Sequence, residues 1–314
     1  MLKYRRKSME TNYIFILNPA AGKNKTALSM IPDIQKTCNK AGLRYQIHIS
    51  QSGEDITSYV KMLCENKDKK YRFYAFGGDG TLNQVINGCA GAENAEVGVF
   101  PLGTGNDFIR TTGVSSKEFF DLKKQLFSTS EKIDTIKYNG KYCINICNMG
   151  FDANTAVDMP KFKKVPVIGK SMAYNMSIAY NVCKKLGRYM EIYCDDRLLY
   201  KGDTLMCAVS NGTACGGGFK VTPRAVTNDG LIDVNVTTPP KRVKLPLFVK
   251  NFSNGTQYED PAMKKYIHYV QCKKVTVKAA KPFALVNDGE AEYLQEVSFE
   301  IVPANINFII PKEI

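Results

Sequence analysis

The sequence contains only two histidines, His48 and His268, and neither has a neighbour at a spacing typical of metal ligands. A zinc site is therefore not expected. Ten cysteines are present, but they are scattered along the chain and no two of them form a CxxC pair. This pattern predicts reduced, mostly buried thiols rather than a disulfide framework.

Long apolar runs are also lacking. The longest ones, such as residues 13–17 and 245–249, are too short to span a bilayer. The basic amino terminus is followed by an apolar run too short for a secretory signal. With 44% apolar and 23% charged residues, the composition is that of an ordinary globular protein, long enough for two cores. We expect a cytoplasmic protein.

Acidic residues are fewer than basic ones, 30 against 43, which gives a formal net charge of +13. Such a charge attracts nucleic acid, an anionic membrane or a polyanionic substrate. No nucleic-acid-binding motif accompanies it, so nucleic acid is not expected as a partner. Lysines cluster at residues 161–170, 239–244 and 263–266. These clusters predict either a solvated lysine surface or contact with an anionic membrane, and both interpretations stay open.

The pattern of apolar residues differs between the first and the second part of the chain. In the first part, short apolar runs alternate with amphipathic stretches such as residues 28–39 and 55–67, which predicts a mostly parallel sheet covered by helices. We therefore expect an α/β domain over residues 11–132, completed by the tail 303–314.

The second part has closely spaced strands in which apolar residues alternate with polar ones. This pattern predicts an antiparallel β domain over residues 133–302. Two helical insertions are expected, near residues 171–186 and near residues 243–251.

Residues 73–83, FYAFGGDGTLN, carry the strongest chemical signal. An apolar strand ends in Gly77 and Gly78, and a helix-like stretch follows. Glycines allow the backbone to approach a phosphate closely, and the N–H groups of a helix start favour anions. The carboxylate of Asp79 would repel a bare phosphate, so the loop predicts a nucleotide bound together with Mg²⁺. The alternative is a tight strand-to-helix connection.

Two further loops follow predicted strands, NPAAGKNK at residues 18–25 and PLGTGNDF at residues 101–108. Open α/β sheets bind their ligands at the carboxyl ends of neighbouring strands. Thr104 offers a hydroxyl there, and Asp107 offers a carboxylate for a metal-bound phosphate. Neither loop has Walker A spacing. For the second loop, the alternative is a helix start capped by Asn106 or Asp107.

Two Asn-Asp-Gly turns lie in the second half. NDGE, at residues 287–290, is either a hairpin turn or the place where Asp288 accepts the proton of an attacking hydroxyl as a general base. TNDGLIDV, at residues 227–234, is more typical of a hairpin or of a small metal-bound turn.

In combination, these motifs resemble the diacylglycerol kinase catalytic family, specifically the soluble bacterial lipid kinases. Sphingosine and ceramide kinases are more distant relatives. The resemblance extends over almost the whole chain, in the order NPAAG, GGDGTLNQVING, PLGTGNDFIR, NMGFDA, NGTACGGGFKVTP, NDGLIDV and NDGE. It implies an α/β domain like that of phosphofructokinases and NAD kinases, joined to a C-terminal all-β sandwich. ATP would lie in the cleft between the two domains.

The resemblance also assigns residues by motif position. Asp288 would be the general base, with Glu290 as its orienting partner or as the alternative base. A structural Mg²⁺ would be held by the Asp229 carboxylate and by the carbonyl groups of Val226 and Leu231. Asp79 and Asp107 would act through a Mg²⁺ bound to the nucleotide. The ATP site would comprise Asn18, Pro19, Ala20, Ala21, Gly22, Ser50, Gly77, Gly78, Asp79, Gly80, Thr81, Leu82, Asn83, Thr104 and Asp107.

We therefore expect an ATP- and Mg²⁺-dependent lipid kinase, a transferase of phospholipid biosynthesis that converts diacylglycerol to phosphatidic acid. It would attach peripherally to an anionic membrane through its basic clusters. Other acceptors remain alternatives, namely phosphatidylglycerol, a sphingoid base and undecaprenol. An NAD kinase, which shares GGDGT, and a non-catalytic regulator are the rival classes; PLGTGND argues against the first and the intact acidic residues against the second. The oligomeric state is left open, with a homodimer as one option.

Overall fold

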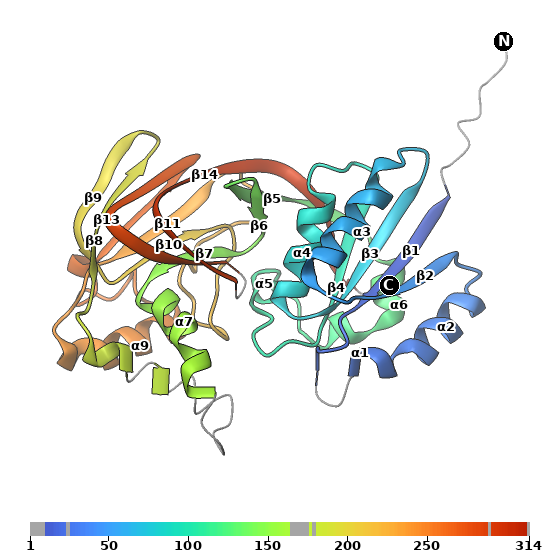
Figure 1. The fold of residues 1–314 in the computed structure, drawn as a ribbon, viewed down its shortest axis with the longest axis horizontal. Helices are drawn as coiled ribbons and strands as arrows, with labels where there is room; N and C mark the ends of the chain where they lie inside the picture. The colour runs from blue at the N-terminus through green and yellow to red at the C-terminus, as the bar shows by residue number, and fades with distance from the viewer. Residues whose placement is uncertain (1–9, 23–25, 164–175, 178–179, 288–289, 313–314) are drawn as a thin grey trace, which may run out of the picture. The chain divides into compact units, whose positions relative to one another are not determined.

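The computed structural model describes residues 10–22, 26–163, 176–177, 180–287 and 290–312. It divides into two compact units (Figure 1). The first comprises Met1–Asn106, Thr112–Ile133 and Asn305–Ile314, and the second comprises Asp107–Thr111 and Asp134–Ala304. We expected Asp107–Thr111 in the first domain. It groups with the second unit, where its side chains accept hydrogen bonds from the backbone N–H groups of Thr213 and Gly217.

The first unit contains a parallel sheet with the strand order β4-β3-β1-β2. Its strands are β1 (Thr11–Leu17), β2 (Tyr45–Ile49), β3 (Lys70–Gly77) and β4 (Ala95–Pro101). The end of β14 (Glu290–Ile309) pairs in parallel with β4 through Asn307 and Phe308. All residues of β3 except its first are buried, which requires a helix layer on each face of the sheet. The expected parallel sheet is confirmed.

Helices cover both faces of this sheet (Figure 1). Helices α1, α2 and α6 pack against Phe15, Phe76 and Phe100. Helices α3 and α4 lie together on the opposite face, and they can approach closely because Gly88 has no side chain. A Cβ atom at Gly88 would lie 2.6 Å from the Cβ atom of Val60. The elements are α1 (Thr26–Ser29), α2 (Ile31–Lys40), α3 (Gly53–Glu65), α4 (Asp79–Cys89), α6 (Leu122–Phe127) and the 3-10 turn η2 (Glu118–Phe120).

The second unit is an antiparallel β-sandwich. Strands β12, β11, β10 and β7 pair in this order, and β9 pairs with β8. The long strand β13 contacts both sets, since residues 285–287 pair with β7 and residues 275–278 pair with β8. Its register shifts between Lys278 and Phe283, and such an irregularity lets a strand bend from one layer to the other. The strands are β5 (Ser130–Tyr138), β6 (Lys141–Cys143), β7 (Ile146–Gly150), β8 (Arg188–Cys194), β9 (Arg197–Thr204), β10 (Met206–Ser210), β11 (Ile232–Thr237), β12 (Ile267–Cys272), β13 (Lys274–Asn287) and β14.

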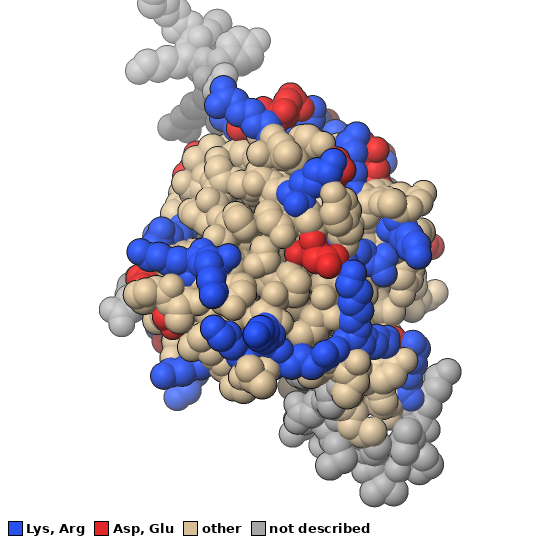
Figure 2. All heavy atoms as spheres, turned by 90° about the vertical axis from the view of Figure 1, so that its left-hand side faces the viewer, with Lys and Arg blue, Asp and Glu red and all other residues tan. Residues whose placement is uncertain are grey.

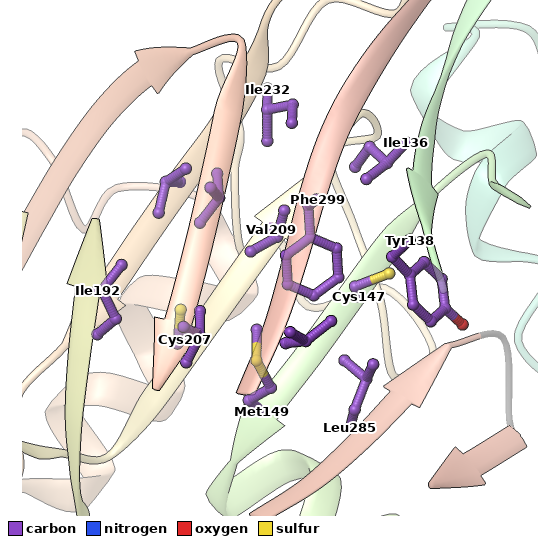
Figure 3. Packing of buried hydrophobic residues seen from close by; sticks show 14 of the residues in the cluster. Ile136, Tyr138, Cys147, Met149, Ile192, Cys207, Val209, Ile232, Leu285 and Phe299 are labelled. Carbon is purple, nitrogen blue, oxygen red and sulfur yellow. The ribbon is translucent and has the colours of Figure 1, made fainter. Parts of the chain in front are cut away.

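Apolar side chains from these strands fill the interior of the sandwich (Figure 3). Phe299 of β14 is fully buried there, and its ring lies 5.5 Å from the ring of Tyr138 on β5. Met149 of β7 and Val209 of β10 belong to the same cluster. Strands that supply one face to such a core show the alternation from which the β domain was expected.

Two longer helices of the second unit are α7 (Phe151–Lys163) and α9 (Leu245–Asn254). Helix α9 confirms the insertion expected near residues 243–251, and it ends at Gly255, which adopts a φ of 78°. The insertion expected near residues 171–186 lies mostly outside the described residues. Helix α7 was not expected, because its apolar residues do not recur at a helical spacing. The short elements are α5 (Asp107–Thr111), η3 (Arg242–Lys244) and η4 (Lys264–Tyr266).

The cysteines are mostly buried, as the sequence predicts. None of the ten cysteines forms a disulfide bond, and eight of them are buried. Lys and Arg side chains are spread over the face shown in Figure 2, whereas Asp and Glu form small groups on it. Within the described part of the chain, no helix is long and apolar enough to cross a membrane.

Candidate functional site

The carboxyl ends of the parallel strands in the first unit lie level with one another. Leu17, the last residue of β1, is in register with Phe76 of β3 and with Ile49 of β2. Gly77 of β3 is in register with Pro101 of β4. The loops that follow these strands therefore begin at one edge of the sheet, where α/β folds bind their ligands.

A side-chain hydrogen bond joins two of these loops. The Asn18 amide nitrogen, just after β1, donates to the Thr81 hydroxyl in the first turn of α4, at 3.0 Å. The Asn18 amide oxygen accepts the Ala20 backbone N–H at 2.9 Å, which shapes its own loop. Gly22 lies in the same loop and has a φ of 82°, a conformation that glycine adopts without strain.

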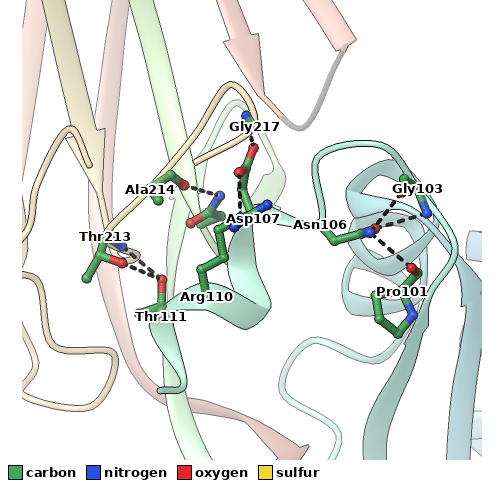
Figure 4. A network of polar contacts seen from close by, with 10 residues as sticks. Pro101, Gly103, Asn106, Asp107, Arg110, Thr111, Thr213, Ala214 and Gly217 are labelled. Atoms are coloured by element: carbon green, nitrogen blue, oxygen red, sulfur yellow. Dashed lines mark hydrogen bonds and ion pairs between the residues drawn. The ribbon is translucent and has the colours of Figure 1, made fainter. Parts of the chain in front are cut away.

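The loops after β3 and β4 touch through glycines. A Cβ atom at Gly103 would lie 2.5 Å from the Cα atom of Gly78, so only glycine fits there. The Asn106 side chain closes the second loop by donating to the carbonyls of Pro101 and Gly103, at 2.9 and 2.8 Å (Figure 4). Asn106 also accepts the Gly103 N–H. This residue therefore shapes the preceding loop, a role different from the helix cap that we considered.

Helix α4 starts at this edge. Its N-cap residue is Gly78, which offers no side-chain acceptor to the first-turn N–H groups. Asp79 is the first residue of the helix, whereas Leu82 and Asn83 point into the buried interior. A helix start of this kind favours an anion over its N–H groups.

Two other expected nucleotide contacts differ in their surroundings. Ser50 is buried, and its hydroxyl and backbone N–H both donate to the carbonyl oxygen of Leu17, at 3.3 and 3.0 Å. This places Ser50 at the end of β2, next to the loop after β1. Thr104 is exposed at the tip of the loop after β4.

Asp107 belongs to the second unit. Its buried carboxylate accepts the Gly217 backbone N–H at 2.9 Å and pairs with Arg110 at 3.4 Å (Figure 4). Four residues later, the Thr111 hydroxyl accepts the Thr213 N–H at 2.9 Å. Helix α5 is thereby attached to the glycine-rich segment 212–218. No local pattern in the sequence predicts this attachment.

The NDGE turn connects two long strands. Asn287 ends β13, Glu290 begins β14, and the two residues are paired in the antiparallel register. The Asn287 side chain donates to the Tyr138 hydroxyl at 3.0 Å, in a buried position. Asp288, the expected general base, lies outside the described residues. The strands flanking the turn agree with the hairpin interpretation.

The TNDG turn is held by a residue that the sequence did not single out. Asp134 is 2% exposed, and its two carboxylate oxygens accept the N–H groups of Gly230 and Ala304, at 2.8 and 2.7 Å. Its own N–H donates to the carbonyl of Thr227. Asp134 occupies a polar position of a strand-like run, where nothing in the local pattern marks it.

The donors expected for a structural Mg²⁺ lie in the same turn. One Asp229 oxygen accepts the Leu231 N–H at 3.0 Å, and the other is 3.4 Å from the Gln271 amide nitrogen. Carboxylate and carbonyl oxygens are the donor types that Mg²⁺ accepts, together with waters, so the chemistry of Asp229, Val226 and Leu231 fits the ion. Within the described ranges, no group of three or more His, Cys, Asp or Glu side chains could hold a metal.

Comparison with known proteins agrees with this arrangement. Residues 12–138 match the diacylglycerol kinase catalytic domain. Residues 145–310 match the YegS C-terminal NAD kinase beta sandwich-like domain. The chain belongs to this family of lipid kinases. The two matched regions lie in the α/β part and in the sandwich part of the structure, as the resemblance implied.

Individual members of the family match along most of their length. A diacylglycerol kinase of Bacillus subtilis (strain 168) is 27% identical over 300 residues, which cover 95% of this chain and 96% of the relative. A Shewanella frigidimarina protein named "Probable lipid kinase YegS-like" is 28% identical over 276 residues, or 86% and 85% of the two chains. The crystal structure of a diacylglycerol kinase from Bacillus anthracis str. Sterne has the same fold, with a TM-score of 0.68 and 19% identity over 97% of this chain and 98% of that one.

Proposed function

We propose that the protein transfers the γ-phosphoryl group of ATP to the hydroxyl of a neutral membrane lipid. Diacylglycerol is the first candidate, with phosphatidic acid as the product. The observation that carries this proposal is the meeting of the loops after β1, β3 and β4 at one sheet edge, in a chain of the lipid kinase family. The names of the relatives from B. subtilis and S. frigidimarina support a lipid acceptor.

The triphosphate would lie against this edge. Its oxygens would face the first turn of α4, where the helix dipole favours negative charge. Gly78 and Gly103 leave the backbone accessible there, since neither carries a side chain. The hydrogen bond between Asn18 and Thr81 would hold the two loops in place before the nucleotide arrives.

In the transfer, the acceptor oxygen forms a bond to the γ-phosphorus, and the bond from that phosphorus to the β–γ bridging oxygen breaks, which releases ADP. The hydroxyl proton passes to a carboxylate, which we assign to Asp288 with Glu290 as the alternative. When bound, Mg²⁺ would neutralise part of the triphosphate charge, and the carboxylates of Asp79 and Asp107 are the residues expected to hold it.

The acceptor is tested by incubating the protein with labelled ATP and a panel of diacylglycerol, phosphatidylglycerol, sphingosine, undecaprenol and NAD. We expect label in phosphatidic acid. Label in another lipid would replace diacylglycerol as the acceptor, whereas label in NAD alone would overturn the lipid kinase assignment.

The base is tested separately with Asp288→Asn and Glu290→Gln. The first variant should keep ATP binding while transfer falls by about 10²-fold or more. The second should lose less if Glu290 only orients Asp288. Full turnover by Asp288→Asn would place the base elsewhere.

We also propose that the protein attaches to anionic membranes through its basic clusters. Residues 239–244 and 263–266 are described, and their lysines are mostly exposed, whereas the cluster 161–170 is described only up to residue 163. Attraction of this kind is screened by salt. Sedimentation with anionic vesicles should therefore weaken steeply as the salt concentration rises, and binding independent of salt would contradict the proposal.

A further inference from the structure

The second unit contains a cavity of about 720 Å³ beside helix α7. This volume lies within the range of about 300–1,000 Å³ that small-molecule ligand sites have. Phe151 and Val157 of α7 and Leu205, between β9 and β10, form an apolar part of its wall. The residues that line it all fall between Gly150 and Tyr293, so the cavity belongs to the second unit alone.

Basic side chains outnumber acidic ones among the described residues that line this cavity. Among the described residues that line it, Asp158 is the one carboxylate. Five basic side chains line it as well, namely Lys161, Lys184, Lys185, Arg188 and Lys281. A low-dielectric wall beside several cations raises the affinity of a site for anions. An apolar chamber bordered by cations is therefore complementary to an amphiphile with an anionic head.

The single acid holds two of these cations in place. Asp158 is buried, and its carboxylate accepts hydrogen bonds from Lys161 at 2.5 Å, from Lys184 at 2.9 Å and from the Asn181 amide at 3.2 Å. Burial alone would raise the pKa of Asp158, but these hydrogen bonds outweigh it and the pKa lies below its usual value. Asp158 therefore stays ionised and keeps both ammonium groups at the cavity wall.

Of the remaining cations of the rim, Lys185 pairs with Asp203 at 3.2 Å. Arg188 donates to the backbone carbonyls of Lys281 and Pro282, which joins β8 to the bend of β13. Tyr189 and Tyr293 line the cavity with half or more of their surface exposed. Tyrosines whose ring is partly buried and whose hydroxyl contacts water are typical of the interface between water and lipid.

An exposed apolar residue lies next to this rim. Arg242 of η3 donates to the carbonyls of Val182 and Lys184, at 3.0 and 2.9 Å, and so ties its loop to the cavity wall. The next residue, Val243, is 84% exposed between Arg242 and Lys244. An apolar tip flanked by cations suits the surface of an anionic bilayer.

We propose that this cavity binds a single anionic glycerophospholipid drawn from the membrane, with an acyl chain in the apolar chamber and the headgroup phosphate at the basic rim. Nothing in the proposal depends on which hydroxyl the enzyme phosphorylates. A free phosphate would use only the rim and leave the chamber unfilled.

The test uses the full-length protein and soluble short-chain lipids below their micelle concentration. Binding is measured by calorimetry for short-chain phosphatidylglycerol, for short-chain phosphatidylcholine and for inorganic phosphate. We expect phosphatidylglycerol to bind at least about tenfold more tightly than either of the others. Equal affinity for phosphatidylcholine would overturn the role of the basic rim, and equal affinity for inorganic phosphate would overturn the role of the chamber.

Two variants locate the site. Lys185→Glu/Lys281→Glu reverses two rim charges, and Ala280→Trp fills the mouth at an exposed position without changing the charge. Each should weaken phosphatidylglycerol binding by about tenfold or more. The matched control is Lys36→Glu/Lys40→Glu, which makes the same change in net charge on exposed positions of α2 and should bind as the wild type does. Wild-type affinity in both cavity variants, or an equal loss in the control, would overturn the proposal, with thermal unfolding as the check that each variant is folded.

Discussion

Asn18 and Thr81 are hydrogen-bonded at 3.0 Å although they are 63 positions apart in the sequence. One follows β1 and the other lies in the first turn of α4, which follows β3. Gly103, in the loop after β4, contacts Gly78, so this loop also packs against the start of α4. The three loops are therefore held against one another by the protein itself, and such preorganisation would lower the cost of binding the triphosphate that we propose as their ligand.

The hydroxyl of Thr81 can be tested by Thr81→Val, which keeps the shape of the side chain and removes the acceptor of the Asn18 bond. We expect the free energy of unfolding to fall by about 0.5–1.5 kcal/mol and the KM for ATP to rise. Urea unfolding and initial-rate kinetics measure the two effects. Thr81→Ser keeps the hydroxyl and should resemble the wild type. Identical behaviour of the two variants would show that the hydrogen bond does not matter.

The glycine contact can be tested by Gly103→Ala. The new Cβ atom would lie 2.5 Å from the Cα atom of Gly78, so the backbone of one of the two loops would have to move. We therefore expect the free energy of unfolding to fall by about 1–3 kcal/mol and ATP binding to weaken. Gly53→Ala is the matched control. Its Cβ atom would also meet an atom at 2.5 Å, but that atom is the end of the Gln84 side chain, which can rotate away. Equal losses in thermal unfolding would contradict this explanation.

The buried carboxylate of Asp134 can be tested by Asp134→Asn. The Asp134 carboxylate accepts hydrogen bonds from two backbone N–H groups. In the variant, one of these N–H groups would face the amide NH₂ of the new side chain, so one buried hydrogen bond to a charged group would be lost. We expect about 2–4 kcal/mol of destabilisation in urea unfolding. The control is Asp196→Asn in the exposed β8–β9 turn, where the change should stay within about 0.5 kcal/mol. A small effect at Asp134 would mean that the turn at residues 227–230 is held by other contacts.

The thiols give a prediction about reactivity. Burial raises the pKa of Cys38 and of Cys64 to about 11, so both remain protonated at pH 8, and Cys183 is the exposed cysteine. A thiol reagent at pH 8 should therefore modify Cys183 first in the folded protein and all ten cysteines in denaturant. Cys183→Ser should abolish the fast phase. A fast phase that survives this substitution would place a second accessible thiol elsewhere.

Local patterns in the sequence predicted what depends on neighbouring residues. Burial on both faces makes β1 and β3 nearly continuous apolar runs, and one buried face gives β8 and the middle of β14 their alternation. The Gly-Gly-Asp-Gly-Thr loop was recognisable because its glycines stand where a strand turns into a helix. Each of these features depends on about ten consecutive residues, so the spacing of apolar residues and glycines in the sequence is enough to predict it.

Contacts between distant segments were not predictable in this way. Asp107 and Gly217 are 110 positions apart, and their hydrogen bond depends on how the second unit folds. Asp134 has the same local setting as any polar residue of a strand. The cavity beside α7 is built from residues between 150 and 293, and no short stretch of the sequence contains its charge pattern.

The shared strand β14 has a consequence for how the protein is made. Residues 305–309 belong to the first unit, whereas the strand begins in the second, and the chain passes between the units four times, after residues 106, 111, 133 and 304. A ribosome that has produced the first 133 residues has therefore not yet supplied the strand segment that pairs with β4. The first unit cannot be finished until the sandwich has been synthesised, so the two units must mature together rather than one after the other.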